Sequence, residues 1–156
     1  MFLFQGVIRT AVHRLKYRGQ RGLAEPLGAL MAEKWLERPV EIDLIVPVPL
    51  HPRRLRQRGY NQAALLASAL AQRVQRPVRE EALVRVRNTH PQMELGRAER
   101  RRNVQGAFRC REDVRGRRVL VVDDVCTTGA TLEACADALR AGGARQIWAL
   151  TLARAP

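Results

Sequence analysis

A strand, a turn and a helix can be recognised between residues 117 and 141, and they constrain what the chain can fold into. Residues 119–122 form a continuous apolar run, which is typical of a strand covered on both faces of a sheet. Asp123-Asp124 and a Thr-Thr-Gly turn follow, and then apolar residues at helical spacing as far as a Gly-Gly pair. A further strand is predicted over residues 146–152. Strand, helix and strand in this order predict a parallel sheet with a right-handed crossover.

The rest of the chain alternates in the same way. Apolar spacing predicts helices over residues 5–17, 23–36 and 61–74, and β-rich runs predict strands over residues 43–48, 82–86 and 106–110. A length of 156 residues suits one domain. We therefore predict an α/β fold over residues 1–156, with a central, mostly parallel sheet of about five strands flanked by helices. A short helical cap over residues 1–40 would cover a core over 41–156. No apolar run approaches the ~20 residues of a membrane span.

Positive charge is concentrated in two segments. The chain has 28 Lys+Arg against 15 Asp+Glu and a net charge of +13. Residues 51–60 contain four arginines and no acid, and residues 85–118 contain eleven arginines against four acids. Such clusters imply an anionic partner, which is phosphate, pyrophosphate or nucleic acid. The three cysteines form no C-x-x-C pair, so we interpret them as buried thiols of a protein in a reducing cytoplasm.

The turn after the strand at 119–122 combines features that suit a sugar phosphate. Backbone N–H groups of residues 127–131 would open the next helix and form a phosphate cradle, with threonine hydroxyls as further donors. Asp123 and Asp124 are good acceptors for two vicinal sugar hydroxyls. Phosphate beside a diol describes a ribose 5-phosphate. The alternative is a solvated strand end followed by an ordinary helix cap. No G-x-G occurs and no Gly precedes a Lys, so the dinucleotide fingerprint and the P-loop are excluded.

Residues 121–131 resemble the phosphoribosyl pyrophosphate (PRPP) motif of type I phosphoribosyltransferases. The wider pattern resembles their ComF branch (ComFC/GntX-like), named for competence for DNA uptake. The matching segments occur in family order at residues 15–19, 46–50, 58–62, 91–92, 99–108 and 123–124. Members of this branch commonly begin with a Cys-rich zinc ribbon, and this sequence departs from them because its first residues contain no such module.

This resemblance implies a type I phosphoribosyltransferase-like fold and roles for individual residues. Asp123 and Asp124 would hold the ribose hydroxyls and act in catalysis, together with Arg100. The 5-phosphate would be held by Thr127, Thr128, Gly129, Ala130 and Thr131. The pyrophosphate would be held by Arg53, Arg54, Arg58 and Gly59 of a loop over residues 50–60. A flexible loop would contain Gln92, Arg100, Arg101, Arg102 and Asn103. The expected cofactor is Mg²⁺, held mainly by ligand oxygens rather than by protein side chains.

Three functions stay open at this point. The first is a phosphoribosyltransferase, in which arginines neutralise the departing pyrophosphate while an oxocarbenium-like centre develops. The second is a regulator that senses PRPP or a nucleotide without turnover. The third is a nucleic-acid-binding protein of DNA uptake that binds single-stranded DNA weakly. A homodimer is a further possible assembly, and the acceptor of any transfer is not identified.

Overall fold

The computed structural model describes residues 1–88 and 102–155. The predicted helices and strands are confirmed with small shifts at their ends. In chain order the elements are β1 (Phe2–Leu3), α1 (Gly6–Tyr17), the 3₁₀ turn η1 (Arg21–Leu23), α2 (Ala24–Leu36), β2 (Leu44–Pro47), α3 (Pro52–Arg58), α4 (Gln62–Val74), β3 (Leu83–Arg85), β4 (Phe108–Cys110), β5 (Arg118–Cys126), α6 (Ala130–Ala141) and β6 (Gln146–Arg154).

The central sheet is parallel throughout, with strand order β1-β6-β5-β2. The prediction of about five strands in one sheet is wrong, because β3 and β4 pair antiparallel with each other in a separate sheet. A single bridge, Ile45 to Val78, extends the pairing beside β2. Strand β1 was not predicted, since two residues are too few to show an alternating pattern. Its partner β6 lies at the other end of the sequence, so no local pattern predicts their pairing.

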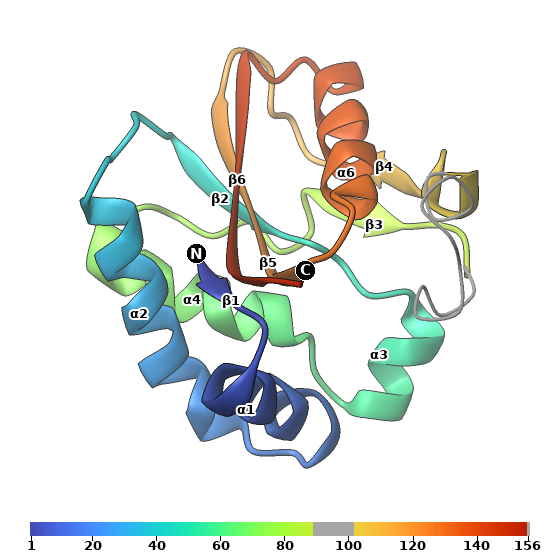
Figure 1. Cartoon of the computed structure of the whole chain (residues 1–156). Helices are drawn as coiled ribbons and strands as arrows, with labels where there is room; N and C mark the ends of the chain where they lie inside the picture. The colour runs from blue at the N-terminus through green and yellow to red at the C-terminus, as the bar shows by residue number, and fades with distance from the viewer. Residues whose placement is uncertain (89–101, 156) are drawn as a thin grey trace.

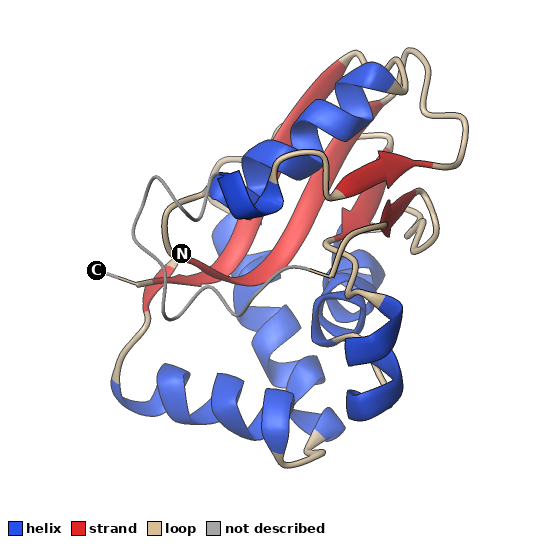
Figure 2. Cartoon of the chain, turned by 90° about the vertical axis from the view of Figure 1, so that its right-hand side faces the viewer, coloured by secondary structure: helices blue, strands red, loops and turns tan. Residues whose placement is uncertain are grey.

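Helices cover both faces of the sheet (Figure 1). Helices α1, α2 and α4 enclose one core with Leu120 and Val122 of β5, and this core includes the fully buried Leu15 and Leu66. Helix α6 and the β3–β4 pair enclose the other core, against Val119 and Val121. The second view shows α6 lying along the strands on its own face (Figure 2). Because consecutive residues of β5 enter opposite cores, the whole apolar run is buried, as its sequence predicted.

Strand β5 is longer than the apolar run. The sequence places the end of the strand at Asp123 and Asp124, but the pairing with β6 continues through Val125 and Cys126. The two acids are therefore part of a strand rather than of a loop. Successive side chains of a strand point to opposite faces, so the two carboxylates start from different sides of the sheet.

Within the described residues, no helix has both the length and the apolar character that crossing a membrane requires. The three cysteines are free thiols, and Cys135 is fully buried in the core under α6. Burial raises the pKa of the Cys135 thiol well above its usual value.

Candidate functional site

The candidate site lies at the carboxyl edge of the sheet. Strands β2 and β5 are parallel neighbours, with Pro47 opposite Val122. The segments that follow them, α3 and residues 127–131, therefore leave the sheet at the same edge. Ligands of open α/β sheets bind beyond this edge. The topology thus brings together two predicted parts of the site that lie far apart in the sequence.

The turn between β5 and α6 has the backbone that the phosphate interpretation needs. Gly129 adopts a φ of +82° and caps α6, and a Cβ at this position would meet no atom within 4 Å. The glycine is therefore required by the left-handed backbone, and the space beside it is open to a ligand. The Thr128 hydroxyl accepts a long hydrogen bond from the Ala130 N–H at 3.4 Å. Thr127 is exposed, Thr128 and Thr131 are half-buried, and Ala130 is buried.

The two carboxylates differ in their surroundings. Asp124 is only 2% exposed, and its Oδ2 lies 2.5 Å from the Lys16 Nζ at the end of α1. This contact is an ion pair, and only 22% of the Lys16 side chain and 3% of the Asp124 side chain are exposed. Asp123 is half-buried, and its Oδ1 accepts the backbone N–H of Asp124 at 2.8 Å.

The two acids differ in how readily they ionise. Burial, and then the charge of Asp124, raises the pKa of Asp123 well above its usual value. Burial is the largest influence on Asp124 and opposes its ionisation. The charge and hydrogen bond of Lys16, together with a hydrogen bond to Asp123, outweigh burial and lower the pKa of this carboxyl. Burial likewise opposes the charge of Lys16, and the two acids reverse that effect, so the pKa of Lys16 is raised. The ion pair of Lys16 and Asp124 is therefore charged at neutral pH.

The basic segment after β2 was expected to be a loop, and this expectation is wrong. Pro52 to Arg58 form helix α3, because His51 caps it by accepting the Arg53 N–H at 3.3 Å and proline suits its first position. Gly59 ends the helix with a φ of +78°. Arg53 is exposed and Arg54 is half-buried.

Contacts between aromatic and arginine side chains join α3 to the N-terminal helices. The Arg58 guanidinium lies 5.4 Å from the centre of the Tyr17 ring and donates to Gln62. The Arg21 guanidinium lies 4.6 Å from the centre of the Tyr60 ring, and the Tyr60 hydroxyl donates to the Leu15 carbonyl. The end of α1 and the segment after α3 therefore form one wall beside the carboxylates.

Two basic residues near the carboxylates were not among the predicted site residues. Lys16 stands in the segment 15–19, where the sequence allows two interpretations: it could close over the site, or it could simply end an amphipathic helix. No local pattern indicates that it reaches Asp124. Arg85 of β3 is half-buried, with its guanidinium 5.4 Å from the centre of the Phe108 ring. Burial, and then the nearby charge of Arg54, lowers the pKa of Arg85, and Asp123 opposes this effect. Arg85 thus lies near both the basic helix and the carboxylates.

Only part of the predicted flexible loop falls within the described residues. Gln92, Arg100 and Arg101 lie outside them, so their roles stay predictions. Arg102 is exposed and Asn103 is half-buried. The strands on either side of the segment are held together, because the Arg87 guanidinium donates to the Gln105 carbonyl at 2.7 Å.

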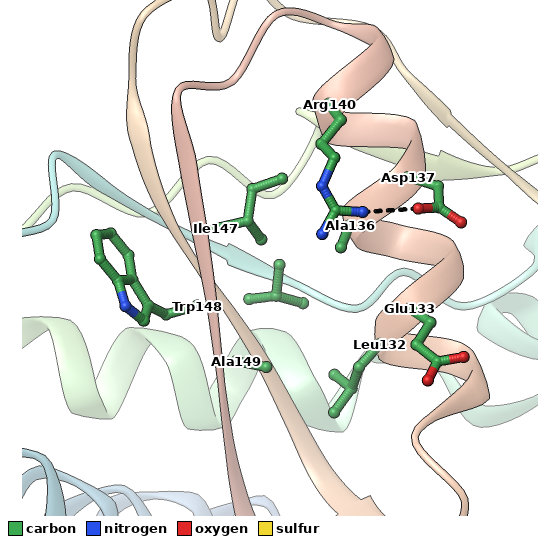
Figure 3. A pocket seen from close by; sticks show the side chains of 9 residues that line it. Leu132, Glu133, Ala136, Asp137, Arg140, Ile147, Trp148 and Ala149 are labelled. Atoms are coloured by element: carbon green, nitrogen blue, oxygen red, sulfur yellow. Dashed lines mark hydrogen bonds and ion pairs between the residues drawn. The ribbon is translucent and has the colours of Figure 1, made fainter.

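A groove of about 360 Å³ lies elsewhere, between α6 and β6 (Figure 3). Leu132, Ala136, Ile147 and Ala149 contribute to its walls, and an ion pair between Asp137 and Arg140 lies on the helix side. None of the predicted ligand residues lines this groove. Among the described residues, no three His, Cys, Asp or Glu side chains come together as a metal site would require.

Comparisons with known proteins give the family. Residues 60–156 match the phosphoribosyl transferase domain. The chain is 37% identical over 146 residues to the DNA utilization protein YhgH of Escherichia coli O157:H7, covering 89% of this chain and 64% of that protein. It is 36% identical over 152 residues to Competence protein F of Haemophilus influenzae, covering 92% and 66% respectively. The chain thus spans less than two thirds of the length of these relatives.

The fold agrees with the sequence match. The purine phosphoribosyltransferase of Pyrococcus horikoshii Ot3 superposes with a TM-score of 0.51 at 20% identity, covering 85% of this chain and 73% of that one. At this identity the likeness concerns the fold alone, which is the type I phosphoribosyltransferase-like fold predicted from the sequence. Together with the match over residues 60–156, it shows that the chain belongs to the phosphoribosyl transferase domain family.

Proposed function

We propose that this protein binds PRPP and transfers its ribose 5-phosphate, with release of pyrophosphate. The observation that carries the proposal is the position of the turn after β5. This turn, with its left-handed Gly129, lies at the same sheet edge as the basic helix α3. A phosphate cradle, two carboxylates and a cluster of arginines at this edge would suit one ligand that contains a phosphate, a diol and a pyrophosphate.

In this proposal each group has a separate task. Residues 127–131 hold the 5-phosphate through backbone N–H groups and threonine hydroxyls. Asp123 and Asp124 accept hydrogen bonds from the ribose hydroxyls. Arg53, Arg54 and Arg58 neutralise the charge that develops on the departing pyrophosphate, which is electrostatic stabilisation of the transition state. Arg100 acts from the loop on the same charge. The acceptor is unassigned, because no described residue identifies a base.

A divalent metal fits this site only if oxygens of the bound ligand coordinate it. The described residues offer no cluster of three metal-ligating side chains, and the more deeply buried carboxylate is paired with Lys16. Mg²⁺ keeps few protein ligands and accepts phosphate oxygens readily. We therefore infer that Mg²⁺ arrives with PRPP, held by oxygens of the ligand, and supplies charge neutralisation there.

Thermal unfolding with and without ligand tests the proposal. A ligand at 100 times its Kd stabilises the folded state by about 2.7 kcal/mol, so PRPP with Mg²⁺ should raise the Tm by several degrees. Asp123→Asn should reduce the shift sharply, since the carboxylate becomes a weaker acceptor. Asp137→Asn, in the exposed pair with Arg140, is the matched control and should keep the full shift. Pyrophosphate release with candidate bases then tests transfer. No Tm shift at millimolar PRPP would refute the proposal.

A second candidate function, binding of single-stranded DNA, is favoured by the distribution of charge. Residues 1–24 and 44–79 contain no Asp or Glu, and contacts such as that of Arg21 with Tyr60 join these segments. We infer that the basic residues of these segments and the exposed Tyr17 form one surface, and we call it the acid-free surface. Lys16 and Arg73 are exceptions within it, because they pair with acids from outside the two segments. The relatives named for DNA utilization and competence add support. This function would operate beside PRPP binding rather than replace it.

A further inference from the structure

We propose that Lys16, supplied by the N-terminal helix α1, is a positioning residue of the ribose site that holds the Asp124 carboxylate ready for a sugar hydroxyl. The inference rests on the proposed function and adds a residue to it. Lys16 lies outside residues 60–156, which carry the family match. The N-terminal segment would therefore complete a site whose motif belongs to the matched domain.

Geometry is the first support. The Lys16 Nζ lies 2.5 Å from the Asp124 Oδ2, and this oxygen is buried from solvent. The ammonium group therefore covers one oxygen of the carboxylate. We assign the other oxygen, Oδ1, to the ligand. A carboxylate held on one side in this way loses less rotational freedom when it accepts a hydroxyl.

The backbone of Lys16 is fixed from both sides, which is the second support. The preceding residue, Leu15, is fully buried and its carbonyl accepts the Tyr60 hydroxyl. The following residue, Tyr17, lies against the Arg58 guanidinium. Only 22% of the Lys16 side chain is exposed. A lysine on a solvated helix end would be far more exposed and would have no fixed partner.

The charges of the two carboxylates and of Lys16 are the third support for this role. Asp123 and Asp124 are adjacent and buried, so without a nearby cation they would share a proton. A protonated Asp124 could not accept two hydrogen bonds with equal strength. Lys16 is the cation with a described contact to this pair, and Tyr17 and His13 are the titratable groups beside it on α1. Arg85 of β3 and Cys135 of α6 face Asp123 from the other side of the sheet.

The chain offers an exact charge-matched control, since Lys16 and Lys34 are its two lysines. Lys34 lies 2.5 Å from Glu37 on the surface of α2. Kd for PRPP with Mg²⁺ would be measured by calorimetry from pH 6.5 to 9 for wild type, Lys16→Met, Lys16→Arg and Lys34→Met. The phosphate groups of PRPP titrate in the same way whether wild type or a variant is measured. The ratio of each variant's Kd to the wild-type Kd at the same pH therefore isolates the effect of the lysine.

For Lys16→Met we expect a Kd about tenfold higher than wild type near pH 7, equivalent to one unit of pKa. The ratio should fall as pH rises, because both carboxylates then ionise without help. Lys16→Arg should keep the charge and give a ratio that does not change with pH, and Lys34→Met should bind as wild type does. A Lys16→Met ratio of one, or a raised ratio that is equal at every pH, would overturn the inference.

A measurement without ligand guards against loss of folding in the variant. In protein labelled with ¹⁵N-lysine, the side chains give two Nζ signals, assigned with Lys34→Met. Asp124→Asn should shift the Lys16 signal and leave the Lys34 signal in place, and an unmoved Lys16 signal would contradict the ion pair. Wild-type protein that fails to bind PRPP would instead refute the proposed function, so the two failures are distinguishable.

Discussion

Asp43, directly before β2, is held by Arg118 at the start of β5. One carboxylate oxygen accepts the Arg118 backbone N–H at 2.8 Å, and the other accepts the Arg118 Nη2 at 2.9 Å. These bonds to Arg118 lower the pKa of Asp43 from 3.8 to about 2. A group whose pKa is lower in the folded state adds stability above its unfolded pKa. That stability is lost as pH falls through the folded value.

Asp43→Asn should therefore lower the Tm at pH 7 and have much less effect near pH 2. The reason is that the carboxylate contributes while it is ionised, and both forms of the protein approach the same state once Asp43 is protonated. Thermal unfolding at a series of pH values checks this. Asp137→Asn removes an exposed ion pair and should change the Tm little. An equal loss of Tm for Asp43→Asn at both pH values would show that the ionised form is not what matters.

At the scale of elements, helices α2 and α4 pack closely against each other. A Cβ on Gly28 would lie 2.4 Å from the Ala69 Cβ and 3.2 Å from the backbone of α4. The two helices can thus approach only because one of them has a glycine at the crossing. This contact holds the N-terminal helices against the core, and with them the end of α1 that carries Lys16.

Gly28→Ala should destabilise the protein by about 1–3 kcal/mol, the usual cost of overpacking. The matched control is Gly22→Ala, where a Cβ would meet no atom within 4 Å. That change should be near neutral or stabilising by up to about 1 kcal/mol, because it restricts the unfolded chain. Chemical denaturation measures both. If Gly28→Ala proved as harmless as Gly22→Ala, the close packing of α2 on α4 would be wrong.

Helix α3 allows a prediction about which part of PRPP its arginines bind. Replacing Arg53, Arg54 and Arg58 with Gln should weaken pyrophosphate binding at least tenfold and ribose 5-phosphate binding much less, since the helix is proposed to contact pyrophosphate alone. Arg115, Arg140 and Arg145, replaced together, remove the same charge from the opposite edge of the sheet and serve as the control. Calorimetry with each ligand gives the comparison. Equal losses for both ligands in the α3 variant would mean that its arginines act through general charge.

At the scale of the whole molecule, charge is unevenly placed. The acid-free surface gathers basic residues from two segments that are distant in sequence, whereas the acids lie elsewhere along the chain. A field of one sign attracts any polyanion at low salt. The aromatic content of 4% provides few rings on which bases can stack. The surface is therefore suited to electrostatic rather than base-specific binding.

Single-stranded DNA should bind at low salt, and log affinity should fall with log salt at about −0.7 per neutralised phosphate. Binding should be negligible near physiological salt, and PRPP should displace it partly, because α3 belongs to both sites. Fluorescence anisotropy across a salt series measures this. Arg9 and Arg14, which are exposed on α1, replaced with Gln should make the slope shallower while leaving PRPP affinity within twofold. DNA binding that persists at physiological salt and ignores PRPP would make the nucleic-acid function the primary one.

Much of the molecule could be predicted from local sequence. Apolar periodicity gave the helices and longer strands, and the predicted cap at Asn61 is confirmed, since its Oδ1 accepts the Ala63 N–H at 3.0 Å. The motif at residues 121–131 indicated the family because its function depends on neighbouring residues. Short elements were less predictable. Helix α3 was expected to be a loop, and β1 was missed, because two or seven residues carry little periodic signal.

What the tertiary structure alone decided are contacts between segments distant in sequence. The packing of α1 on the sheet brings Lys16 Nζ within 2.5 Å of Asp124 Oδ2. No sequence pattern around either residue predicts this contact. The order β1-β6-β5-β2 likewise places α3 beside the turn after β5. Local sequence determines backbone preference and the burial of each face over a few turns. Which charged groups then share a site depends on how those faces pack together, and packing is a property of the whole chain.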